Sequence, residues 1–91
     1  MDELRRVTQL LVNQVSHWTQ ARWGDRGDVF YEALQRIAGP QHPLPRLSDL
    51  VLPDQLRVVV SDLIDRGAGP AEVSRAIEVL TAVRGTLKAS Q

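Results

Sequence analysis

The chain has 91 residues, with 11 basic side chains, 11 acidic side chains and no cysteine. A chain of this length corresponds to one small domain, which buries too little apolar surface to enclose an elaborate active site. The zero net charge argues against a general polyanion binder, because such proteins carry clustered Lys and Arg in excess. The lack of cysteine excludes a disulfide framework and a thiolate metal site.

The sequence lacks the features of exported and membrane proteins. Its first residues, Met1, Asp2 and Glu3, differ from the basic and apolar start of a secretory signal. The longest apolar runs, such as residues 58–60, are far shorter than the roughly 20 residues needed to cross a bilayer. We therefore expect a cytoplasmic protein with no membrane partner.

The predicted elements are all helices, because apolar residues recur at helical spacing in four segments and no segment alternates. The first predicted helix covers residues 3–18, and Asp2 and Glu3 lie at the positive end of its dipole. Its apolar stripe consists of Leu4, Val7, Leu11, Val15 and Trp18. The second predicted helix covers residues 28–38 and begins at Asp28, a residue type that commonly caps helix N-termini.

Prolines mark the remaining boundaries. Three prolines between positions 40 and 45 exclude a regular helix there, so residues 39–46 are predicted to form a connector. The third predicted helix covers residues 53–66, with Pro53 in the first turn, where its missing N–H would be unpaired in any case. The fourth predicted helix covers residues 70–88 and begins in the same way at Pro70.

The predicted fold is an all-α, compact three- or four-helix bundle formed by residues 1–91 as a single domain. Only a few residues separate the third and fourth helices, which predicts an antiparallel C-terminal hairpin. The apolar arc of the fourth helix is wider than one neighbouring helix requires. This helix is therefore expected either to lie centrally or to offer a surface for self-association. On the third helix, Val58 lies away from the apolar stripe.

The most unusual local group is Trp18, Arg22 and Trp23, because the segment 17–23 holds both tryptophans of the chain. Trp and Arg dominate binding hot spots, since they combine large contact area with directed donors. On a helical wheel Trp18 lies inside the apolar stripe, whereas Trp23 would lie near the opposite side if the helix continued. We interpret Trp23 as the candidate exposed contact, beside Arg22. The other interpretation is that Trp18 is the last core residue of the first helix and that Trp23 folds back as a lid over the core, and the sequence leaves both open.

Catalytic and metal-binding patterns are absent from the sequence. The two imidazoles, His17 and His42, come from a helix end and a proline-rich loop, and their spacing does not predict a metal site. The sequence contains no Gly-rich phosphate loop, nucleophile elbow or HExxH string. We therefore expect no enzyme activity, no catalytic residue, no cofactor and no metal.

Residues 63–76 resemble the turn and recognition-helix start of helix-turn-helix repressors. A turn glycine is followed six positions later by an apolar residue, and then by Ser74 and Arg75. In that family the second helix enters the major groove, so the resemblance implies a DNA-binding domain that uses these two side chains. The segment departs from the family pattern because Leu63 replaces a small residue and the polar Asp62 and Arg66 replace apolar ones.

A second resemblance covers the whole chain. The strings HWT at 17–19 and LPDQLRV at 52–58 resemble segments of small all-helical proteins of high-GC actinobacteria. This resemblance agrees with the preference of the chain for arginine over lysine. It implies no activity, cofactor or partner.

The function expected from these observations is that of a non-enzymatic protein-protein interaction or regulatory module. Helical core patterning, missing catalytic groups and a balanced charge favour it. The partner is expected to be another protein or a second copy of the chain, rather than nucleic acid. The expected contact surface is the region of Trp18, Arg22 and Trp23 or the last helix, and the alternative is a helix-turn-helix-like DNA-binding domain.

Overall fold

The computed structural model describes residues 2–89, which form helices and no strand. Four long helices build the molecule: α1 (Asp2–Val15), α3 (Arg26–Ala38), α4 (Leu52–Asp65) and α5 (Pro70–Ala89). Two short helices, α2 (Gln20–Trp23) and the 3-10 helix η1 (Asp49–Val51), lie in the connections. The predicted all-α bundle is confirmed. Within residues 2–89, no helix combines the length and apolar character that crossing a membrane requires.

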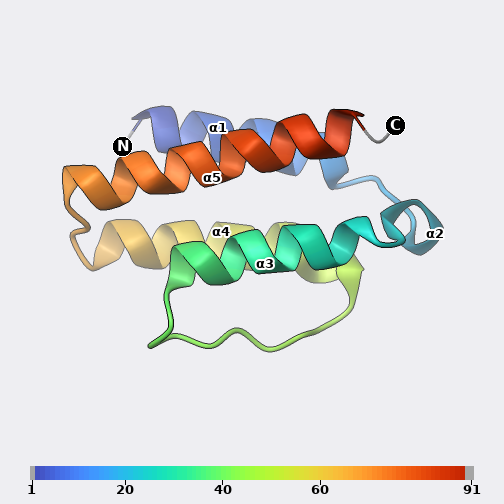
Figure 1. The fold of residues 1–91 in the computed structure, drawn as a ribbon, viewed down its shortest axis with the longest axis horizontal. Coiled ribbons are helices and arrows are strands. Elements are labelled where there is room, and N and C mark those ends of the chain that lie inside the picture. Colours follow the sequence, from blue (N-terminus) through green and yellow to red (C-terminus); the bar gives the residue numbers. More distant parts are fainter. Residues whose placement is uncertain (1, 90–91) are drawn as a thin grey trace.

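The four long helices form two parallel pairs that run in opposite directions. Helices α1 and α5 run one way and α3 and α4 the other (Figure 1). Both α4 and α5 pack against α1 and against α3. The predicted C-terminal hairpin is therefore antiparallel, but its two helices lie diagonally across the bundle, with α1 and α3 between them.

Packing against two neighbours explains the wide apolar arc of α5. Its central residues are buried in the core, namely Ala76, Leu80, Val83 and Leu87. Val73, Ile77 and Val79 flank this line and are partly buried against the same core. The arc therefore meets α1 on one side and α3 on the other, and a second copy of the chain is not needed to explain its width. Self-association stays a prediction.

The helix boundaries differ most from the prediction at the end of α1. The predicted helix 3–18 ends at Val15, because the chain turns at residues 16–17 and starts the separate helix α2. The Thr19 hydroxyl caps α2 by accepting a hydrogen bond from the Arg22 backbone N–H at 3.2 Å. This break separates the direction of the α2 side chains from that of the α1 stripe. The helix predicted over residues 28–38 begins two residues earlier, at Arg26.

Candidate functional site

The two tryptophans lie inside the protein. Trp18 is 4% exposed and Trp23 is 1% exposed. The Trp23 ring contacts Trp18 edge-on at 5.0 Å between centroids and Phe30 at 5.4 Å. The edge-to-face geometry is the one that aromatic quadrupoles favour. The three rings therefore form an aromatic cluster of the core, located where the chain passes from α1 through α2 to α3.

Of the two interpretations of Trp23 that the sequence leaves open, the core position agrees with the structure and the exposed contact is wrong. The exposed contact assumed that the first helix continues to residue 23, whereas the turn after Val15 redirects the chain and carries Trp23 inward. Of the three predicted contact residues, only Arg22 is exposed. Its guanidinium lies 5.0 Å from the centre of the Trp18 ring, within the range of a cation-π contact. Arg22 therefore covers the aromatic cluster from the solvent side.

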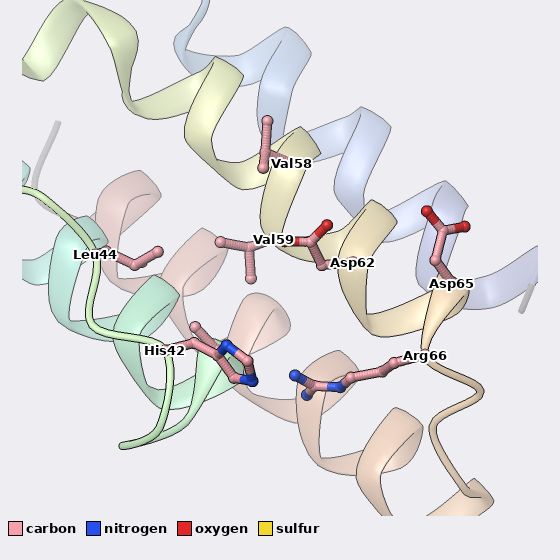
Figure 2. Close-up of a pocket in the computed structure, with 8 residues that line it drawn as sticks. His42, Leu44, Val58, Val59, Asp62, Asp65 and Arg66 are labelled. Atoms are coloured by element: carbon pink, nitrogen blue, oxygen red, sulfur yellow. The ribbon is translucent and has the colours of Figure 1, made fainter.

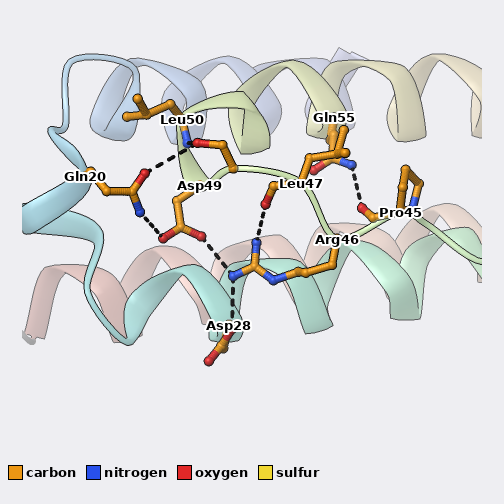
Figure 3. Close-up of polar contacts among 9 residues, drawn as sticks. Gln20, Asp28, Pro45, Arg46, Leu47, Asp49, Leu50 and Gln55 are labelled. Atoms are coloured by element: carbon orange, nitrogen blue, oxygen red, sulfur yellow. Dashed lines mark hydrogen bonds and ion pairs between the residues drawn. The ribbon is translucent and has the colours of Figure 1, made fainter.

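A polar network built around Asp49 holds the end of the connector against the bundle (Figure 3). The Asp49 carboxylate is buried, and it accepts hydrogen bonds from Gln20 Nε2 and from Arg46 Nη2, both at 2.8 Å. The same Arg46 nitrogen donates to Asp28 on α3 at 2.9 Å. These hydrogen bonds, to Asp49 first and Asp28 second, raise the pKa of Arg46. The network thus ties η1, α2 and α3 together.

The middle of the connector is fixed by side chains of α3. The Tyr31 hydroxyl donates to the Leu44 carbonyl at 2.6 Å, and Gln35 Oε1 accepts from the Leu44 N–H at 2.8 Å. Gln35 Nε2 also donates to the His42 carbonyl at 3.2 Å. The Arg46 guanidinium lies over the Tyr31 ring at 5.2 Å. Residues 39–48 are therefore fixed against α3 by side-chain hydrogen bonds, and we call this fixed segment the wall.

We predict that replacing Arg46 by Ala loosens this wall. Asp49 would stay buried with one hydrogen-bond partner fewer, which costs about 1–2 kcal/mol of unfolding free energy. Hydrogen exchange of the Leu44 amide should accelerate because the wall opens locally. The matched control is Arg57→Ala, whose ion pair with Asp54 is solvent-exposed and should contribute little. Equal effects of the two substitutions would contradict the role of Arg46.

The wall forms one side of an open groove, and α4 forms the other (Figure 2). This connector groove has a volume of about 410 Å³ and is lined by Ala38, His42, Leu44, Val58, Val59, Asp62, Asp65 and Arg66. Its apolar part contains Val58, which is 59% exposed. The sequence indicated only that Val58 lies off the buried stripe. The facing residue, Leu44, could not be found from local patterns because it is separated from α4 by the connector.

Comparison with protein-family models, with curated proteins and with solved structures finds no match to this chain. The proposal for its function therefore rests on the geometry and chemistry of the site. The two resemblances, to helix-turn-helix repressors and to small actinobacterial helical proteins, stay predictions.

The other residues considered from the sequence lie apart. His17 is exposed in the turn after α1, whereas His42 lies on the connector in the groove. In the part of the chain that the structure describes, no group of three or more His, Cys, Asp or Glu is arranged to hold a metal ion. Ser74 and Arg75 are exposed near the start of α5, in the segment that the helix-turn-helix resemblance covers.

Proposed function

We propose that the chain is a non-enzymatic interaction module that binds a short segment of a partner protein in the connector groove. The observation that carries this proposal is the apolar part of the groove, where Val58 lies open to solvent beside a wall held in place by Tyr31 and Gln35. A fixed wall favours binding, because little conformational entropy is lost when the partner arrives.

The charges of the groove indicate the chemistry of the partner. Asp62 and Asp65 line it, and among residues 2–89 neither takes part in an ion pair. The cation beside them, Arg66, is already paired with Glu72 at 2.6 Å. A complementary segment therefore carries an apolar side chain for the Val58 surface and a neighbouring Lys or Arg for the two carboxylates.

The shape of the groove favours a protein segment over an enclosed small molecule. Small-molecule sites usually bury most of the ligand surface. This groove is bounded by the connector on one side and α4 on the other, and it is open to solvent at Val58 (Figure 2). One or two side chains of an extended or helical segment fill such a space while the rest of the segment stays on the surface.

The test is selection from a displayed library of random short peptides, followed by measurement of the enriched peptides in solution. We expect enrichment of apolar residues with a neighbouring Lys or Arg. Val58→Glu should abolish the binding while leaving thermal unfolding nearly unchanged, because Val58 is mostly exposed. The matched control is Leu50→Glu, since Leu50 is 55% exposed and lies outside the groove. Binding that survives Val58→Glu, or no enrichment at all, contradicts the proposal.

Two other partners, a second copy of the chain and duplex DNA, are distinguished by separate experiments. Light scattering over a wide concentration range would detect a second copy of the chain, and a strictly monomeric protein removes that partner. Duplex DNA binding that weakens steeply with salt and is lost in Arg75→Ala would support the DNA-binding alternative. We favour the groove because α4 and α5 run antiparallel on a bundle diagonal, whereas the helices of a helix-turn-helix cross at about 90–120°. A cytoplasmic location stays a prediction.

A further inference from the structure

A second hollow adjoins the connector groove and carries positive charge. It has a volume of about 260 Å³, and three arginines from different parts of the chain line it. Arg36 comes from the last turn of α3, Arg66 follows the end of α4, and Arg75 lies near the start of α5. We call this feature the basic hollow. Glu72 is the acidic side chain among its lining residues.

The arginines of the basic hollow are only partly neutralised from within the chain. Arg66 donates to Glu72 at 2.6 Å. Over the described range 2–89, Arg36 and Arg75 form no ion pair. The helix dipole accounts for Arg36, which lies at the negative end of α3, but not for Arg75, which lies near the positive end of α5. The lining of the hollow, with three arginines and Glu72, therefore has an excess of positive side chains in a chain whose net charge is zero.

The basic hollow and the connector groove belong to one continuous surface. Arg66 lines both of them. Between them lies a third hollow that shares Ala38 and His42 with the groove, and Gly39, Pro40 and Glu72 with the basic hollow. A segment that leaves the groove past His42 therefore arrives at Arg36 and Arg75. Along this path the uncompensated charge changes from negative to positive.

We propose that the basic hollow binds carboxylate side chains of the same partner segment, an inference that rests on the proposed function. Guanidinium groups match carboxylates because their parallel N–H donors form two hydrogen bonds with one acid. Ile37, Ala76 and Val79 form an apolar surface beside the arginines, and such a surface reduces the screening of the charges by water. The bound segment then has an order: its apolar and basic part lies at Val58 and Asp62, and its acidic part lies at Arg36 and Arg75.

The random-peptide selection tests this order when it is repeated with the double variant Arg36→Gln and Arg75→Gln. Wild-type protein should enrich peptides with an apolar and basic part followed, in one direction, by Asp or Glu. The variant should still enrich the apolar and basic part, but without the acids. The control is the double variant Arg5→Gln and Arg6→Gln on the exposed face of α1, which removes the same charge elsewhere and should select the wild-type pattern.

A charge exchange gives the quantitative result. For an enriched peptide, replacing its acid by Lys should weaken binding about tenfold, as expected for the loss of a charge-assisted hydrogen bond. Arg75→Glu should weaken binding of the original peptide similarly and restore binding of the Lys peptide. Circular dichroism should show unchanged helicity, because Arg75 is exposed.

The failures of the two proposals differ in their outcomes. Enriched peptides that lack acids, or acids that persist with the Arg36→Gln and Arg75→Gln variant, overturn the assignment of the basic hollow while leaving the groove in place. No enrichment by the wild-type protein overturns both proposals. If Arg75→Glu does not restore binding of the Lys peptide, the assignment of the basic hollow is likewise overturned.

Discussion

Replacing Trp23 by Ala should cost about 3–5 kcal/mol of unfolding free energy, the range measured for truncation of large aromatic side chains in protein cores. Trp23 is 1% exposed and contacts both Trp18 and Phe30 edge-to-face. Its removal therefore leaves a cavity and breaks the aromatic cluster that joins the turn after α1 to α2 and α3. A domain of this size is stabilised by only about 5–13 kcal/mol, so a large part of its stability would be lost.

Urea unfolding followed by circular dichroism measures this effect, and Arg22→Ala is the matched control. Arg22 is exposed and its guanidinium lies over the Trp18 ring, while its backbone hydrogen bonds survive in alanine, so its loss should change the unfolding free energy by less than about 1 kcal/mol. If the Trp23→Ala protein were as stable as the wild type, Trp23 would be a surface residue, in conflict with its burial in the aromatic cluster.

Replacing Gly27 by Ala should cost about 2–4 kcal/mol, even though alanine favours helix formation at most positions. A Cβ atom at this position in α3 would overlap the Asp49 carboxylate, lying 2.5 Å from its Cγ. Asp49 cannot turn away freely, because Gln20 and Arg46 hold both of its oxygens. Either the carboxylate stays and the helix shifts, or it moves and these hydrogen bonds to a buried charge are lost.

Two companions make the Gly27 result specific. Gly85→Ala should raise stability by about 0.5–1 kcal/mol, because Gly85 lies within α5 and open space surrounds its added Cβ atom. In an Asp49→Ala background the carboxylate is gone, so Gly27→Ala should lose most of its cost. A cost that persists in that background would show that the clash with Asp49 is not its cause.

Part of the candidate site was visible in the sequence. The position of Val58 off the buried stripe predicted its exposure, and the prolines of residues 39–46 predicted a connector without a helix. Nothing in the sequence predicted that Tyr31 and Gln35 hold that connector as a wall. Those contacts join residues on either side of a turn whose course depends on how α3 packs.

The convergence of Arg36, Arg66 and Arg75 was hidden for the same reason. These residues come from three different segments, and each one alone looks like an ordinary exposed arginine. They share a hollow because the C-terminal ends of α3 and α4 meet the N-terminal end of α5 at one end of the bundle (Figure 1).

The sequence by itself determined the four long helices and most of their limits, because helical periodicity, caps and prolines act over only a few residues. Pro70 starts α5 at the predicted position, and α4 begins one residue before the predicted start. Tertiary structure alone decided that Trp23 points inward, that Asp49 needs a glycine at position 27, and that α4 and α5 lie on a diagonal. Each of these depends on which helix faces pack together, and local spacing does not carry that information.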